Sequence, residues 1–373
     1  MPKEFTVTPW KVEGEVDYTK LIKEFGTEAV DENLLSRIKK HTGELHHMLR
    51  RKIFFSHRDL NWLLDEYEKG NKFYLYTGRG PSGNTHLGHL VPWMFTKWLQ
   101  DKFDVELWFQ MTDDEKFLFN DKLELEETNK LAYENALDVI ALGFKKGKTK
   151  IFADTDYAKT LYRQAIRVAK KLTVSTTKAV FGLNDSDSVG KHFFTTVQSV
   201  PAFLPSTLAG KNIPCLIPHA IDQDPHFRVT RDIVHKLGYY KPAAIHCAFL
   251  PALTGPGGKM SASIAETAVY TTDAPEVVAK KIRKYAFSGG AATVEEHRKK
   301  GGNPDIDVSY QWLRFFEEDD KKLEKIYDEY KSGKLLSGEL KEILIEKLTK
   351  FIKQHHENRE KAIKVLDSYI LKD

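Results

Sequence analysis

The chain has 373 residues, of which 41% are hydrophobic, and its 57 Lys+Arg against 53 Asp+Glu leave a formal net charge of +4. This length and apolar content predict about two packed domains, and the small net charge excludes a polybasic tail or an acidic disordered chain. No stretch approaches the ~20 apolar residues of a membrane helix, and the start carries no apolar secretory segment. Two cysteines are too few for a disulfide framework or a four-thiolate zinc site. We therefore expect a cytoplasmic enzyme.

Residues 1–70 are rich in charge and are predicted to form an N-terminal extension. The clearest element in it is a helix over 59–69, where apolar residues recur at i, i+3, i+4 and i+7, with Asp59 suited to the N-cap and Gly70 to the position just past the end. Residues 7–18 are read as a hairpin with a turn near Gly14.

Short apolar runs alternate with helical patterns from residue 71 to about 272. The expected strands are 73–76, 105–111, 151–153, 213–217 and 243–250, and the expected helices are 87–98, 126–142, 157–172 and 225–237. Buried-looking strands that alternate with helices predict an α/β domain with a parallel sheet covered on both faces. Residues 273–373 show helical patterns alone and predict a second, all-helical domain, with the option that its last helix packs back on the first.

The first candidate site is the glycine-rich junction from Tyr76 to His89, between an expected strand and an expected helix. Ligands in open α/β sheets bind beyond the carboxyl ends of strands, and a helix N-terminus offers unpaired N–H groups to an anion. His86 and His89 are three residues apart and share one helix face, so they suit phosphate oxygens. A glycine loop beside two solvated histidines is the alternative reading. A zinc site would need more ligands.

The second candidate is the loop from Leu253 to Ser263, which contains glycines, two serines and Lys259. A lysine on such a loop can reach a pyrophosphate whose negative charge grows in a transition state. Taken alone, the segment is equally consistent with a surface linker.

Together the two candidates form a recognisable pair, H-x-G-H at 86–89 and K-M-S-x-S about 170 residues later, at 259–263. The pair resembles the class I aminoacyl-tRNA synthetases. Three further blocks, YTGRGPSG at 76–83, QMTDDEK at 110–116 and AIDQDP at 220–225, make the chain similar to the tryptophanyl-tRNA synthetases of the eukaryotic and archaeal type. The likeness covers nearly the whole chain. Leu87 stands where the usual HIGH pattern has isoleucine, which is also apolar.

The resemblance implies a Rossmann-like catalytic domain over 71–272 and a helical anticodon-binding domain over 273–373. It implies activation of L-tryptophan by MgATP to tryptophanyl-adenylate, followed by transfer to tRNA(Trp). It also implies that the chain forms a homodimer and does not associate with a membrane. The magnesium ion is expected to be bound to ATP, and no metal site made by the protein is expected. Catalysis would fall to His86, His89 and Lys259. The residues implied to bind ATP are Arg79, Gly83, His86, Gly88, His89, Asp222, Lys259, Ser261 and Ser263.

The same resemblance implies a tryptophan site made by Tyr76, Gln110, Glu115, Lys116, Gln198 and Gln223. Indole has one polar group, an N–H donor. Tyr76 and Gln110 would accept its hydrogen bond. Each residue also has an ordinary structural reading: Tyr76 as a core aromatic, Gln110 as a strand-end amide, and Glu115 with Lys116 as a solvated helix start. Asp222, assigned to the ribose, could equally belong to a turn before a helix.

Three other functions compete with this one. A tyrosyl-tRNA synthetase shares the fold and both signature motifs, but it would need an acidic or hydroxyl-matching partner for the phenol of tyrosine. A small-molecule nucleotidylyltransferase would lack the K-M-S-x-S loop and the helical domain. A catalytically silent paralogue would have lost the histidines or Lys259, and all three are present.

Overall fold

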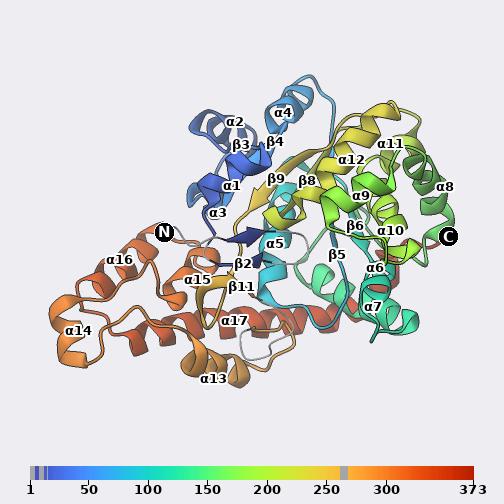
Figure 1. Ribbon diagram of the computed structural model, residues 1–373. Helices are drawn as coiled ribbons and strands as arrows, with labels where there is room; N and C mark the ends of the chain where they lie inside the picture. The colour runs from blue at the N-terminus through green and yellow to red at the C-terminus, as the bar shows by residue number, and fades with distance from the viewer. Residues whose placement is uncertain (1–4, 8–11, 15, 261–267) are drawn as a thin grey trace.

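A central seven-stranded sheet organises the computed structural model, which describes residues 5–373 apart from 8–11, 15 and 261–267 and gives only the backbone at 13 and 256–259 (Figure 1). In spatial order its strands are β3 (Glu28–Ala29), β4 (Phe54–Arg58), β9 (Ala243–Cys247), β8 (Cys215–Ala220), β5 (Tyr74–Arg79), β6 (Leu107–Met111) and β7 (Thr149–Ala153). The last five are parallel to one another, whereas β4 pairs antiparallel with β9, and β3 pairs antiparallel with β4. The expected α/β fold class is confirmed, and the sheet is mixed.

Helices connect the strands and cover both faces of the sheet. They are α1 (Tyr18–Phe25), α2 (Glu32–Thr42), α3 (His47–Arg50), α4 (Leu60–Glu68), α5 (Leu87–Phe103), α6 (Asp113–Phe119), α7 (Leu125–Ala141), α8 (Ala158–Ala169), α9 (Val174–Phe181), α10 (Val189–Ser199), α11 (Leu204–Ala209) and α12 (Asp224–Lys236). Leu107 and Phe109 of β6 belong to one buried apolar cluster and Trp108 to another, because successive side chains of a strand point to opposite faces. Within the described residues, no helix combines the length and apolar character needed to cross a membrane.

Two local expectations near the N-terminus need correction. The helix over 59–69 forms as α4, but Asp59 lies in the left-handed region (φ 51°) and makes no capping bond; its carboxylate instead accepts a hydrogen bond from Arg231, 2.6 Å away. The hairpin consists of β1 (Thr6–Val7) and β2 (Val12–Glu13). Gly14 follows β2, so its assignment to the turn was wrong.

The chain beyond residue 273 is helical among the residues described, and it ends on the sheet. Its helices are α13 (Pro275–Tyr285), α14 (Val294–Lys300), α15 (Val308–Phe316), α16 (Asp320–Lys331) and α17 (Ser337–Ile363). Figure 1 shows α17, in red, running from these helices back to the α/β part. There His355 and Arg359 contact Asp138 of α7, at 2.9 Å and 2.5 Å, and Ile370 bridges to Ile151 of β7.

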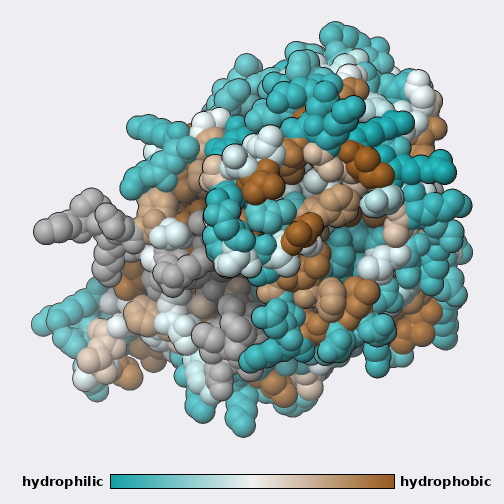
Figure 2. All heavy atoms as spheres, turned by 45° about the vertical axis from the view of Figure 1, so that its right-hand side comes forward, coloured by the Kyte–Doolittle hydropathy of each residue, from teal (hydrophilic) through white to brown (hydrophobic). Residues whose placement is uncertain are grey.

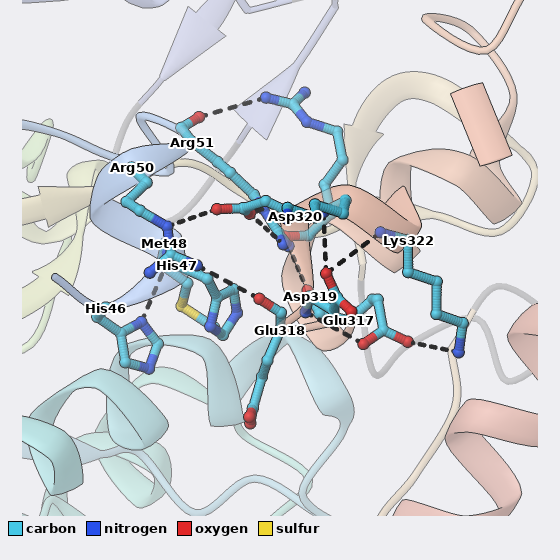
Figure 3. A network of polar contacts seen from close by, with 12 residues as sticks. His46, His47, Met48, Arg50, Arg51, Glu317, Glu318, Asp319, Asp320 and Lys322 are labelled. Carbon is cyan, nitrogen blue, oxygen red and sulfur yellow. Dashed lines mark hydrogen bonds and ion pairs between the residues drawn. The ribbon is translucent and has the colours of Figure 1, made fainter. Parts of the chain in front are cut away.

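A second contact joins α3 to α15 and α16 (Figure 3). Arg50 and Arg51 both bind the carboxylate of Asp320, at 2.5 Å and 2.6 Å, and Arg51 also donates to the carbonyl oxygen of Arg314 at 2.8 Å. His47 pairs with the carbonyl oxygen of Phe315 at 2.8 Å. The N-terminal segment is therefore bonded both to the sheet, through β4, and to the C-terminal helices.

Candidate active site

A cavity of about 440 Å³ opens where the parallel strands β5, β6, β8 and β9 end. β5 and β8 are neighbours although β6 and β7 lie between them in the chain, and α/β sheets bind ligands at such a switch point. Eleven residues singled out from the sequence line this cavity: Tyr76, Arg79, His86, Gly88, His89, Gln110, Glu115, Lys116, Gln198, Asp222 and Gln223.

Of the other four residues singled out, only Gly83 is described with its full surroundings. Gly83 lies outside the lining set, and its carbonyl oxygen accepts a hydrogen bond from Asn135 at 3.2 Å. The backbone of Lys259 ends β11 (Gly255–Lys259), which pairs with β10 (Pro251–Ala252). The side chain of Lys259, and the whole of Ser261 and Ser263, lie outside the described residues. Met260, the residue that follows Lys259, does line the cavity.

One end of the cavity is formed by the start of α5. His86 is the N-cap residue of this helix and is 6% exposed. Its ring stacks on that of His89 with 3.5 Å between centroids, and its backbone N–H donates to Nδ1 of His89 at 3.2 Å. A Cβ on Gly88 would lie 3.1 Å from the His86 ring, so glycine leaves this ring its place against the helix. The two imidazoles and the helix N-terminus thus face one region suited to an anion.

Arg79 adds a buried positive charge to the same end. Its Nε donates to Oδ1 of Asn135 at 3.0 Å, and its Nη1 lies 3.0 Å from Nε2 of His89. Nη2 has no hydrogen-bond partner among the residues the structure describes. Burial lowers the pKa of Arg79 to about 10, so the guanidinium is still charged at neutral pH. A buried cation with an unused donor favours a phosphate in the cavity.

A second part of the cavity wall, its floor, is formed by Tyr76 and Gln110, each 1% exposed. The Tyr76 hydroxyl lies 2.5 Å from Oε1 of Gln110 and 3.1 Å from the carbonyl oxygen of Gln198. The rings of Phe227 and Tyr76 meet edge to face, with centroids 5.7 Å apart. Aromatic walls with two oxygen acceptors suit a flat apolar ligand that carries one donor.

An ion pair lies beside this floor at the start of α6. The carboxylate of Glu115 accepts a hydrogen bond from Thr112 at 2.6 Å and pairs with Nζ of Lys116 at 2.5 Å. Burial alone would raise the pKa of Glu115, but Lys116 and Thr112 together with His226 outweigh it and hold the pKa below its ordinary value. A charged pair of opposite signs at the cavity wall can meet the ammonium and carboxylate of an amino acid.

The turn that carries Asp222 and Gln223 is fixed from behind. It forms the short helix η2 (Ile221–Gln223), and Asp224 begins α12. Asp224 is fully buried, bound by Arg58 of β4 at 2.7 Å and close to Nε2 of His246 at 3.3 Å. Burial would raise the pKa of Asp224, but these two partners hold it well below the ordinary value of 3.8. The carboxylate therefore stays ionised and anchors the turn to two strands.

Several residues that support the site were not found from the sequence. Asn135 and Arg58 look like ordinary polar residues, and no pattern in the chain marks them. Asp154, which binds the amide nitrogen of Gln110, directly follows the apolar run 151–153, and that strand-end position was the available signal.

Comparison with known proteins identifies the family to which the chain belongs. A family model described as tRNA synthetases class I (W and Y) matches residues 68–353. The chain is 54% identical to the tryptophan–tRNA ligase of Saccharolobus solfataricus over 97% of this chain and 94% of that protein. It is 52% identical to the cytoplasmic tryptophan–tRNA ligase of Saccharomyces cerevisiae over 96% and 86%. The crystal structure of Plasmodium falciparum tryptophanyl-tRNA synthetase, 47% identical, gives a TM-score of 0.87 over 92% of this chain and 94% of that one.

The chain belongs to the class I aminoacyl-tRNA synthetases, in the family that serves tryptophan and tyrosine. The two sequence relatives and the structure named above are all on the tryptophan side of that family. The resemblance drawn from the H-x-G-H and K-M-S-x-S motifs is thereby confirmed.

Proposed function

We propose that this chain is a tryptophan–tRNA ligase, which activates L-tryptophan with ATP and transfers the tryptophanyl group to tRNA(Trp). The observation that carries the proposal is a cavity lined by two different groups of residues. One group supplies the buried acceptors of Tyr76 and Gln110, and the other consists of Arg79, His86 and His89 at a helix N-terminus. An indole N–H suits the first group and a triphosphate suits the second.

Tryptophan would lie with its ring on the floor of the cavity. Its indole N–H would donate to the Tyr76 hydroxyl and to Oε1 of Gln110. Glu115, Gln198 and Gln223 would hold the α-ammonium, and Lys116 would lie near the carboxylate. A site that hydrogen-bonds a substrate N–H can reject analogues without it by about 10⁴- to 10⁵-fold, because its own polar atoms are left unpaired.

ATP would occupy the part of the cavity beside the second group. His86, His89 and Arg79 would contact the phosphates, with the N-terminus of α5 behind them. Gly83 and Gly88 would let the backbone approach the nucleotide, and Asp222 would bond the ribose. Lys259, with Ser261 and Ser263 on its loop, would meet the pyrophosphate.

The reaction needs no protein nucleophile. A carboxylate oxygen of tryptophan forms a bond to the α-phosphorus of ATP while the bond from that phosphorus to pyrophosphate breaks, and pyrophosphate leaves with the electron pair. tRNA then takes the tryptophanyl group and AMP leaves. Positioning and the positive charges around the phosphates supply the catalysis.

Magnesium would enter as MgATP. Among the described residues, no three His, Cys, Asp or Glu side chains converge on one point that could hold a metal ion. This donor set suits a magnesium carried by the phosphates of the nucleotide, which takes few ligands from the protein.

We assign residues 1–70 to an N-terminal extension, 71–272 to the catalytic domain and 273–373 to a domain that reads the anticodon. The contacts of α17 with α7 give the last of these a direct connection to the α/β part. The similarity to the cytoplasmic yeast enzyme supports a cytoplasmic location.

A homodimer is part of the proposal, and exposed apolar side chains support it. Tyr162 and Ile166 on α8, Val174 on α9 and Val189 on α10 are between 47% and 84% exposed. Figure 2 turns this side of the molecule forward and shows hydrophobic side chains, in brown, among hydrophilic ones. Exposed apolar side chains that gather on one face are typical of protein interfaces, and these four lie on α8, α9 and α10, of which α8 and α9 both contact α10. Ile166→Glu should give a monomer in light scattering, whereas a wild-type chain that is itself monomeric would contradict the dimer.

Two variants test the division of the cavity. Gln110→Ala should raise KM for tryptophan with little change in KM for ATP, because the indole N–H loses an acceptor. His89→Ala should lower the rate of adenylate formation by about 10²- to 10³-fold at unchanged tryptophan binding, because a donor to the phosphates is lost. Equal losses for both substrates in both variants would contradict the assignment.

A further inference from the structure

Asp154 contacts the cavity floor from behind. It lies directly after β7, is 4% exposed, and its two carboxyl oxygens are 2.8 Å and 2.9 Å from Nε2 of Gln110. On its other side the carboxamide presents Oε1 to the Tyr76 hydroxyl at 2.5 Å. One amide therefore connects a buried acidic side chain to the atoms that face the ligand.

The orientation of the Gln110 carboxamide decides whether the cavity floor presents a hydrogen-bond acceptor or a donor to the ligand. A carboxamide has a donor end and an acceptor end, and turning it by 180° exchanges them. In the reversed position the amide oxygen would face the oxygens of Asp154, and the NH₂ group would face the cavity. An indole N–H would then meet another donor and lose its hydrogen bond.

A second carboxyl group keeps Asp154 an acceptor toward Gln110. The carboxyl groups of Asp114 and Asp154 are hydrogen-bonded to each other, which requires one proton between them. Burial raises the pKa of both groups, that of Asp114 to about 7 and that of Asp154 well above its ordinary value, so the proton belongs to the pair. Asp114 also accepts the backbone N–H of Glu115 at 2.8 Å. Both oxygens of Asp154 accept from Nε2 of Gln110, which leaves Asp114 as the partner for the shared proton.

We infer that Asp154 is a specificity-positioning residue for tryptophan, which holds the Gln110 carboxamide with its oxygen toward Tyr76 and the cavity. The inference rests on the proposed function. Asp154 touches no substrate and acts through Gln110 alone. The arrangement Asp114, Asp154, Gln110, Tyr76 forms one hydrogen-bonded chain that ends in acceptors at the cavity.

The experiment compares tryptophan with β-(3-benzothienyl)alanine, in which sulfur replaces the indole N–H at nearly the same shape. Amino-acid-dependent ATP–pyrophosphate exchange gives kcat/KM for each on the wild type, Asp154→Ala and Asp154→Asn. Asp156→Asn is the matched control, since the Asp156 carboxylate bonds to the Tyr133 hydroxyl and lies two residues from Asp154. Thermal unfolding of each variant checks that it is folded.

Asp154→Ala should lower the preference for tryptophan over the analogue by about ten- to a hundredfold, with KM for ATP unchanged. Asp154→Asn should retain the preference, because its NH₂ can donate to Asp114 while its oxygen accepts from Gln110. Asp156→Asn should behave as wild type. Should the alanine variant not fold, the nearly isosteric Asp154→Leu is expected to show the same loss.

A folded Asp154→Ala or Asp154→Leu that keeps the wild-type preference overturns the inference. So does a variant that loses tryptophan and ATP use in equal measure, since that reports damage to the whole site. Failure of the proposed function is separately visible, because the wild-type chain would then show no exchange with tryptophan.

Discussion

Breaking the buried ion pair between Arg58 and Asp224 should destabilise the protein far more than breaking an exposed pair of the same geometry. Arg58 Nε and Nη2 donate to the two oxygens of Asp224 at 2.7 Å and 2.8 Å, and the side chains are 12% and 0% exposed. Removing one member of a buried pair leaves an uncompensated charge and costs about 3–5 kcal/mol. We therefore expect Arg58→Met to lower the free energy of unfolding by that amount at neutral pH.

The chain contains a matched control for this substitution. Arg283 binds Glu342 in the same two-pronged way, at 2.7 Å and 2.8 Å, but the two side chains are 57% and 53% exposed. Solvent screens such a pair, so Arg283→Met should leave the free energy of unfolding almost unchanged. Urea unfolding, followed in parallel by tryptophan fluorescence and far-UV circular dichroism, measures both variants against the wild type.

The difference in free energy of unfolding between wild type and Arg58→Met should also depend on pH. Because the folded-state pKa of Asp224 lies below 3.8, its ionised form contributes stability above pH 3.8, and the wild type loses that contribution as the pH falls further. The gap between wild type and Arg58→Met should therefore shrink on acidification. A gap below about 1 kcal/mol at pH 7, or equal effects of the two arginine substitutions, would refute the reasoning. The variant should also raise KM for both substrates, since Asp222 and Gln223 share the anchored turn.

Two further predictions concern stability. Gly78→Ala should destabilise the fold by about 1–3 kcal/mol in thermal unfolding, because a Cβ there would lie 2.8 Å from the carbonyl oxygen of Gln110; an unchanged melting temperature would contradict it. For Glu317, burial is outweighed by Lys322 and other partners, which hold its pKa at about 2. The stability that this carboxylate adds above pH 4.5 should be lost as the pH falls toward 2. Lys322→Met should weaken that acid sensitivity, and identical urea midpoints of variant and wild type across pH 2–7 would show that the pair contributes nothing.

The periodic parts of the fold could be predicted from the sequence. Continuous apolar runs predicted five strands of the sheet. The i, i+3, i+4 spacing of apolar residues predicted helices such as α4, α7 and α12, because such spacing marks a buried helix face. β4 was missed because its FFSHR sequence carries polar residues. Ser56 is nevertheless fully buried, since its hydroxyl pairs with Nδ1 of His246 at 2.9 Å on the neighbouring strand.

The cavity-lining residues that belong to short sequence motifs could be predicted. Their supporting partners, which come from distant parts of the sequence, could not. Tyr76, His86 and Gln110 lie in blocks whose local order marks them. Arg58 meets Asp224 because β4 pairs with β9 and β9 pairs with β8, which leads to the turn before Asp224, and no local pattern in the chain reveals these pairings. Asp154 reaches Gln110 because β6 and β7 are in register, with Gln110 beside Phe152. Such partners depend on tertiary contacts across many residues of sequence.

The most direct test of the proposed function is amino-acid-dependent ATP–pyrophosphate exchange by the purified chain with each of the twenty amino acids in turn. We expect exchange with tryptophan and with no other amino acid at comparable concentration, because only an indole N–H satisfies the acceptors of Tyr76 and Gln110. Exchange with tyrosine would keep the fold and the phosphate end of the cavity but overturn the tryptophan site. Exchange with none, together with no charging of total tRNA, would contradict the proposed ligase activity.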